Sequence, residues 1–187
     1  MGKTTLLGDC ARAFPDFECE TEAYRSLRSF NPDLHIGLGR EADKHAMWIL
    51  QGNLMGKLLR HRKGDKVFFD RGPADMLAYS LYAWEERETD LDAGFLQSLR
   101  DIAYIYSREF LDAILFIPLR PDYAIDFEDD GVRPTDDGYR ERVDSHFKRL
   151  YKELDLQIPV LEIQGSRQER ITAIARHLAC QPAVLPP

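Results

Sequence analysis

Apolar residues along the chain follow two alternating patterns. Short continuous apolar runs at residues 66–70, 113–117 and 159–163 are typical of parallel strands that are buried on both faces. Residues 17–19 form a shorter strand candidate. Between these runs, apolar side chains recur three or four positions apart, which predicts amphipathic helices. The predicted helices cover residues 4–14, about 40–62, a segment beginning at Pro73, 91–106, 139–154 and 171–178.

Strands that alternate with helices predict an α/β fold, with helices on both faces of a mostly parallel sheet. No internal repeat or low-complexity linker interrupts the pattern, so we predict a single domain over residues 1–180. The proline-rich residues 181–187 are expected to form a loose tail. Ligands of such folds bind at the carboxyl ends of the strands. The segments of interest are therefore residues 70–71, 118–120 and 164–165.

Composition narrows the possible classes of function. The 187 residues are 44% hydrophobic and 30% charged, with a formal net charge of −7, which is the profile of a folded globular protein. An acidic surface repels a nucleic-acid backbone, so we expect no nucleic-acid partner. No apolar run is long enough to cross a bilayer, and we expect no membrane association. The three cysteines lack CxxC spacing, which favours a reducing, cytoplasmic location over a disulfide framework or a zinc site.

The first residues carry the most specific motif. Gly2-Lys3-Thr4-Thr5 matches the second half of the phosphate-binding pattern GxxxxGK[ST]. In that pattern the glycine lets backbone N–H groups point inward, the Lys3 ammonium reaches the β- and γ-phosphates, and the Thr4 hydroxyl binds Mg²⁺. The helix that follows offers unpaired N–H groups and the positive end of its dipole. The alternative is a lysine at an ordinary helix start, but the α/β order behind it favours a phosphate loop.

The first half of this pattern, a glycine with a strand before it, would precede Met1. A parallel sheet without that central strand would expose two unpaired edges. We therefore expect a fragment or a wrongly assigned start rather than a native design. The fold prediction is accordingly a three-layer αβα P-loop NTPase with a mostly parallel sheet, whose first strand is missing from the chain.

A second candidate site follows the apolar run at residues 66–70. Asp70 can hold Mg²⁺ through water or accept a proton from a substrate hydroxyl. The next residue, Arg71, can bind a phosphate or a sugar with its fork of N–H donors. The alternative is a structural Asp–Arg pair in a loop.

These motifs together resemble the P-loop small-molecule kinases, the group that holds thymidylate kinase, the deoxynucleoside kinases and nicotinamide riboside kinase. The chain looks most similar to the AAA-type ATP-binding domains that include the nicotinamide riboside kinase domain. The resemblance covers nearly the whole chain. It rests on Gly2-Lys3-Thr4-Thr5, Glu22-Ala23-Tyr24-Arg25, Asp70-Arg71-Gly72 with Asp75, Ala78-Tyr79, Gly131-Val132-Arg133 and Arg140.

The resemblance implies ATP and Mg²⁺ as cofactors and suggests roles by position. Lys3 and Thr4 would serve the phosphates and the metal, and Asp70 would be a metal-site residue or a base. Glu22 lies where the deoxynucleoside kinases carry the acid that activates the acceptor hydroxyl, and Glu20 is its rival. The alternative for Glu22 is a solvated loop carboxylate. Substrate binding would fall to Arg71, Arg25 and Asp75.

A predicted lid covers about residues 120–140, an acidic segment flanked by arginines. In the related kinases a lid at this position closes over ATP, and its arginines stabilise charge on the transferred phosphoryl group. Arg133 and Arg140 are the best candidates for this role, with Arg120 and Arg142 behind them. The alternative is a helix face whose arginines pair with nearby carboxylates at the surface.

Four further residues carry weaker signals. Gly165 and Ser166 follow the last strand, where related proteins often frame the adenine. Ser166 and Glu169 also have the spacing of a capping box, which explains the serine equally well. On the helix predicted at about residues 40–62, Trp48 could stack on a base and Gln51 could hydrogen-bond one, although packing in the core is the simpler interpretation.

The leading hypothesis is phosphoryl transfer from ATP–Mg²⁺ to a small acceptor such as a nucleoside, a nucleotide or a similar metabolite. A second hypothesis is an ATPase or a nucleotide-dependent switch that has no small-molecule acceptor. A third is a truncated product that binds nothing. The sequence leaves the acceptor and the oligomeric state open.

Overall fold

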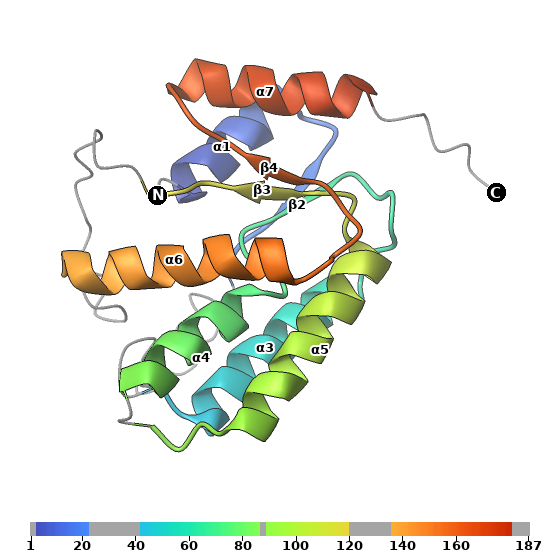
Figure 1. Cartoon of the computed structure of the whole chain (residues 1–187). Helices are drawn as coiled ribbons and strands as arrows, with labels where there is room; N and C mark the ends of the chain where they lie inside the picture. The colour runs from blue at the N-terminus through green and yellow to red at the C-terminus, as the bar shows by residue number, and fades with distance from the viewer. Residues whose placement is uncertain (1–2, 23–41, 87–88, 120–135, 181–187) are drawn as a thin grey trace, which may run out of the picture.

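The computed structural model describes residues 3–22, 42–86, 89–119 and 136–180, which Figure 1 shows as coloured ribbons. Strands and helices follow one another much as the hydrophobic pattern predicts, with each strand trimmed to three residues. The elements are α1 (Lys3–Ala13), β1 (Glu18–Glu20), α3 (Lys44–Leu58), β2 (Val67–Phe69), α4 (Asp75–Glu86), α5 (Ala93–Phe110), β3 (Ile114–Phe116), α6 (Asp137–Glu153), β4 (Val160–Glu162) and α7 (Arg167–Cys180).

The four described strands form two separate two-stranded parallel sheets. β1 pairs with β2, so that Cys19 lies opposite Phe68. β3 pairs with β4, so that Leu115 lies opposite Leu161. Within the described ranges β2 and β3 are not paired with each other. The parallel pairing agrees with the predicted α/β class, but the strands are divided between two half-sheets.

Helices cover the strands from both sides (Figure 1). On one side α1 packs against α7, and a small core forms around Leu6, Cys10, Ile163 and Ile174. On the other side α3, α4, α5 and α6 enclose a larger core, which includes Met47, Leu58, Leu77, Leu99 and Leu150. Burial of these apolar side chains is the main favourable contribution to folding.

Aspartates begin three of the helices. The side chain of Asp43 accepts a hydrogen bond from the Ala46 N–H at 2.7 Å, and Asp92 and Asp136 do the same at α5 and α6. Such caps satisfy backbone N–H groups that the first turn of a helix leaves unpaired. The helix predicted at about residues 40–62 is therefore shorter than expected and runs from Lys44 to Leu58.

The helix predicted to begin at Pro73 begins two residues later, at Asp75. The Asp75 N–H donates to the Gly72 carbonyl at 3.0 Å, and the Asp75 carboxylate accepts from the Gly72 N–H at 3.0 Å. These two bonds close a turn over Gly72–Asp75, so Pro73 lies inside the turn and not at the first helical position.

The predicted capping box at the start of α7 is confirmed. The Ser166 N–H donates to Glu169 Oε2 at 2.7 Å, and the Glu169 N–H donates to the Ser166 hydroxyl at 3.3 Å. Gly165 precedes it with φ of +88°, and a Cβ at this position would lie 2.6 Å from Glu169 Oε2. Only glycine adopts this backbone conformation without strain. Helix capping thus accounts for both residues.

The side chain of Trp48 is not part of the core, contrary to the simpler interpretation of its position. It is 50% exposed on α3 and contacts Phe95, with 5.5 Å between the ring centroids. Gln51 is fully buried as that interpretation expects, yet neither polar atom of its side chain has a hydrogen-bond partner in the structure. The apolar periodicity located the helix correctly, but it did not determine which side of the helix Trp48 occupies.

An ion pair links α1 to α7. Arg167 Nε donates to Asp9 Oδ2 at 2.8 Å, and Arg12 also pairs with Asp9. The hydrogen bond from Arg167 is the main reason that the pKa of Asp9 is lowered from 3.8 to about 2. A carboxyl group with a lowered pKa stabilises the folded state above its ordinary pKa, and this contribution is lost as the pH falls through the lowered value.

Asp9→Asn is therefore expected to lower the urea midpoint of unfolding at pH 7. The difference from the unchanged protein should shrink below about pH 4 and be mostly lost near pH 2, because Asp9 itself becomes protonated as the pH falls through its lowered pKa. Asp16→Asn is the control, since its side chain is 81% exposed and lies 3.8 Å from Lys66. Urea denaturation at several pH values makes the measurement, and a difference that persists unchanged at pH 2 would show that Asp9 acts through packing instead.

Candidate functional site

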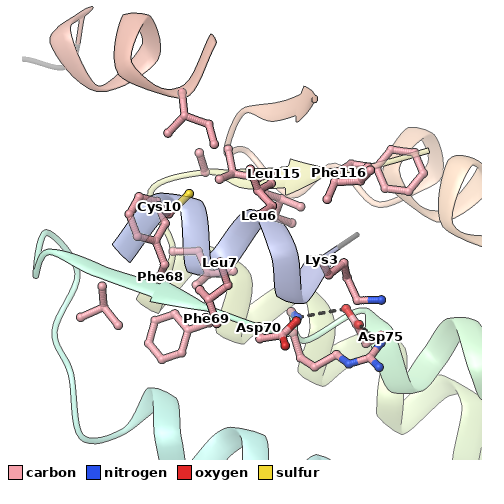
Figure 2. A pocket seen from close by; sticks show the side chains of 18 of the residues that line it. Lys3, Leu6, Leu7, Cys10, Phe68, Phe69, Asp70, Asp75, Leu115 and Phe116 are labelled. Carbon is pink, nitrogen blue, oxygen red and sulfur yellow. Dashed lines mark hydrogen bonds and ion pairs between the residues drawn. The ribbon is translucent and has the colours of Figure 1, made fainter. Parts of the chain in front are cut away.

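A cleft of about 690 Å³ lies between β2 and β3 (Figure 2). α1 lines it with Leu6, Leu7 and Cys10, and the two strands line it with residues 66–70 and 113–117. The walls are mostly apolar, and burial raises the pKa of the Cys10 thiol to about 11. The central part of the cleft therefore offers hydrophobic surface and no nucleophile that is ionised near neutral pH.

One end of the cleft brings together a lysine, an arginine and two aspartates. Figure 2 shows Lys3, Asp70 and Asp75 close together, away from Cys10 and Phe68. This end is where β2 finishes and α1 begins. Burial raises the pKa of Asp70, although the positive charges of Arg71 and Lys3 act in the opposite direction. A lysine, an acid and a helix N-terminus thus meet at the carboxyl end of a parallel strand.

Arg71 is buried at the centre of a hydrogen-bond network. Its Nε donates to Glu22 Oε1 at 2.9 Å, and its Nη2 contacts the same oxygen. Its Nη1 donates to Asp75 Oδ2 at 3.0 Å and to the Tyr79 hydroxyl at 2.8 Å. Burial disfavours the cation, but Tyr79, Glu22 and Asp75 together raise the pKa of Arg71 well above its usual range. A structural pair between Asp70 and Arg71 is the alternative interpretation of the sequence. Arg71 does have a structural role, but its partners are Glu22 and Asp75.

Glu22 and its rival Glu20 have different surroundings. Glu22 is buried against Arg71, so it is not the solvated loop carboxylate of the alternative interpretation. Glu20 lies at the end of β1, where Arg60 Nη2 donates to it at 2.6 Å and Lys57 Nζ is 3.8 Å away. Burial opposes the charge of Glu20, but hydrogen bonds from Arg60 and His61 lower its pKa overall. Glu22 is not itself a lining residue of the cleft, but it is bonded to Arg71, which lines the polar end.

One polar cluster could not be predicted from the sequence. Glu18, Glu20 and His61 bring their ligand atoms within 4.8 Å of one another, although the spacing of the histidines predicts no metal site. His61 comes from the turn after α3 and Glu20 from β1, so only the fold brings them together. Arg60 and Lys57 already neutralise Glu20, so the arrangement is that of an ion-pair cluster.

Of the remaining predicted residues, only some lie at the polar end of the cleft. Thr4 and Thr5 are exposed in the first turn of α1. Arg140 lines the cleft from the first turn of α6, where it pairs with Asp137. Gly165 and Ser166 lie at the start of α7 and do not line the described cleft. Gly2, Arg25, Arg120, Arg133 and most of the predicted lid lie outside the described residues.

Arg142 was a secondary candidate for stabilising the transferred phosphoryl group, but its partners in the structure are structural. It pairs with Glu86 of α4, and its guanidinium carbon lies 4.9 Å from the centre of the Tyr82 ring. This position joins α6 to α4, and the surface-pairing alternative describes Arg142 well.

A phosphate-loop sequence at the start of α1, beside an acid at the carboxyl end of a parallel strand, defines the class as a nucleotide-binding P-loop protein. The family comparison agrees, because the family model described as AAA domain matches residues 1–170. The chain belongs to this AAA domain family. No curated protein gives a significant match to the chain. In the described part of the chain, no helix is long and apolar enough to cross a membrane.

The residues at the polar end fit the phosphates of a nucleotide. Lys3 supplies a positive charge at the wall of the cleft. The first turn of α1 carries no acidic side chain, so none there competes with an anion for the positive end of the helix dipole. The Asp70 carboxyl group and the Thr4 hydroxyl are oxygen ligands of the kind that Mg²⁺ prefers. Together they form a donor set suited to a nucleotide with its metal.

Proposed function

We propose that the protein transfers the γ-phosphoryl group of ATP–Mg²⁺ to a small acceptor, such as a nucleoside, a nucleotide or a similar metabolite. The observation that carries this proposal is the buried Glu22, bound to Arg71 next to Asp70 and Lys3. A simple nucleotide switch has no need for a buried carboxylate so close to its phosphate site. A kinase needs one to accept the proton of the acceptor hydroxyl.

In this proposal the residues divide into a nucleotide side and an acceptor side. Lys3 binds the β- and γ-phosphates, and Thr4 and Asp70 hold Mg²⁺, which neutralises phosphate charge when bound. Gly2 and Thr5 complete the phosphate contacts. On the acceptor side, Glu22 takes the proton, and Arg25 and Asp75 bind the acceptor.

Arg71 has a different role from the substrate contact that the sequence predicts. Four of its five N–H donors are already used by Glu22, Asp75 and Tyr79. We assign it to positioning Glu22, which leaves at most one donor for the acceptor. Arg140 and Arg133 of the predicted lid stabilise the charge that develops on the transferred phosphoryl group.

An acceptor screen tests the proposal. The chain, together with a form extended upstream of Met1, is incubated with ATP–Mg²⁺ and a panel of nucleosides and nucleotides, and ADP release is followed. Turnover that requires one class of acceptor supports the kinase proposal. If ADP release is the same with and without every acceptor, the kinase proposal fails.

Two alternatives have different outcomes in the same assay. Slow hydrolysis that is independent of acceptor favours an ATPase or a nucleotide-dependent switch. The third possibility is that the 187-residue chain, which carries only half of the phosphate-loop pattern, binds no nucleotide. Absence of ATP binding by this chain combined with binding by the extended form would support it.

The three described cysteines are free thiols, which supports a reducing compartment such as the cytoplasm as the working location.

A further inference from the structure

Lys57 is a buried cation on a helix face that is mostly apolar. It lies in the last turn of α3, and its side chain is only 10% exposed. Leu50, Leu54 and Leu58 are buried on the same helix. Lysine is almost never buried unless it is paired, because removing an ammonium group from water is costly. A lysine at this position therefore requires a partner that an apolar side chain could not serve.

The ammonium group of Lys57 reaches the carboxyl end of β1. Its Nζ donates to the Thr21 carbonyl and lies 3.8 Å from Glu20 Oε2. The Glu20 carboxylate does not depend on Lys57 for its charge balance, because Arg60 Nη2 donates to it at 2.6 Å. The contact that sets Lys57 apart is thus the hydrogen bond to the Thr21 backbone.

The residues on either side of Thr21 are both anchored at the end of β2. Before it, the Glu20 carbonyl accepts a hydrogen bond from the Asp70 N–H at 2.9 Å. After it, the Glu22 carboxylate accepts a hydrogen bond from Arg71 Nε at 2.9 Å. β1 ends at Glu20, so regular strand pairing does not extend to Thr21. The Thr21 carbonyl lies between these two anchors, and α3 holds it there.

We infer that Lys57 is a positioning residue for Glu22, an inference that rests on the proposed function, in which Glu22 accepts the proton of the acceptor. By holding the Thr21 carbonyl, Lys57 fixes where the chain leaves β1 and therefore where the Glu22 carboxylate lies. Lys57 does not line the described cleft, so it acts through Glu22. A reacting group that is displaced by about 1 Å can lose about 100-fold in rate.

A purely structural role is the alternative for Lys57. Its positive charge near the end of α3 interacts favourably with the helix dipole, and it lies close to Glu20. Arg60 shares both properties, because it follows α3 directly and pairs with Glu20, but it is 58% exposed and its hydrogen bond goes to the Glu20 carboxylate. Arg60→Met is thus a matched control that removes a similar charge and leaves the bond to Thr21 in place.

Steady-state ADP release, with the acceptor found by the screen, provides the first test. Lys57→Met should lower the turnover number by about 10- to 100-fold and leave the KM for ATP nearly unchanged. Arg60→Met should change the turnover number by no more than about twofold, because an exposed ion pair contributes little. In the Glu22→Gln background Lys57→Met should cause no further loss, because the carboxylate that Lys57 positions is already gone.

Two kinetic results would overturn the inference. The first is a loss by the same factor with and without Glu22, which would mean that Lys57 does not act through that carboxylate. The second is equal turnover in Lys57→Met and Arg60→Met, which would mean that the bond to Thr21 has no effect on the reaction.

Amide hydrogen exchange provides a second test, which needs neither nucleotide nor acceptor. The Asp70 amide donates to β1 and reports on its carboxyl end, and the Ile114 amide is bonded in the other sheet and serves as the reference. Lys57→Met should speed exchange at Asp70 by about tenfold and leave Ile114 unchanged, while Arg60→Met should leave both rates unchanged. An unchanged rate at Asp70, equal acceleration at both amides, or a variant that does not fold would show that Lys57 does not specifically hold the end of β1, and each would overturn the inference.

The two tests separate this inference from the kinase proposal. Absence of turnover with every acceptor overturns the kinase proposal, and the exchange rates then decide by themselves whether Lys57 fixes the segment that carries Glu22. Acceptor-dependent turnover combined with an unchanged exchange rate at Asp70 in Lys57→Met overturns this inference alone.

Discussion

Replacing Arg71 by methionine is expected to lower the free energy of unfolding by about 3–5 kcal/mol, because it leaves two carboxylates buried without their cation. The side chains of Glu22 and Asp75 are 7% and 8% exposed, and that of Arg71 is 4% exposed. Folded domains are stable by only about 5–15 kcal/mol, so the loss would be a large share of the total. Urea denaturation followed by circular dichroism makes the measurement.

Two comparisons identify the cause of that loss. Arg142→Met removes an arginine that is 45% exposed and paired with Glu86, and it should cost no more than about 1 kcal/mol. Adding Glu22→Gln to Arg71→Met should restore part of the lost stability, because one of the uncompensated charges is then gone. A loss for Arg71→Met no larger than that for Arg142→Met would mean that the network does not depend on its central charge.

Glu22→Gln is expected to lower the turnover number by about 100- to 10,000-fold while leaving the KM for ATP nearly unchanged. This is the range that a positioned general base contributes, and the amide cannot accept the proton of the acceptor. The measurement is steady-state ADP release at saturating acceptor, with the acceptor found by the screen.

Asp75→Asn is the matched control, since Asp75 is the other carboxylate bound to Arg71. Both variants should lose similar stability, because each weakens the same network. Asp75→Asn should mainly raise the KM for the acceptor that Asp75 binds, and only Glu22→Gln should lose most of its turnover at saturating acceptor. Glu20→Gln should retain activity, because Arg60 and His61 hold Glu20 at the end of β1. If Glu20→Gln is the inactive variant instead, the assignment of the base is wrong.

The elements of the fold could be predicted because burial imposes a period on the sequence. Val67–Phe69 and Ile114–Phe116 are strands within the predicted apolar runs, and the stripe from Tyr139 to Leu154 is α6 with its cap. Helix starts were less predictable, because local turns decide them. Asp43 caps α3, and the Gly72–Asp75 turn delays α4.

The site was only partly predictable, because contacts between distant segments carry no local pattern. The phosphate-loop motif and the position of Asp70 after a strand could be found from the sequence alone. The bond between Glu22 and Arg71 spans 49 positions, and the sequence suggested both residues without pairing them. The Glu18, Glu20 and His61 cluster likewise depends on how β1 and the end of α3 meet. Gly2, Arg25 and Arg133 stay predictions.

The central claim is that a nucleotide binds at the polar end of the cleft through Lys3. Calorimetric titration of ATP–Mg²⁺ tests it most directly, with the unchanged protein and its Lys3→Met variant in parallel. A charged hydrogen bond of this kind contributes about 1.5–3 kcal/mol, so the variant should bind about 10- to 100-fold more weakly. Tight binding that is equal with and without Lys3 would contradict the claim.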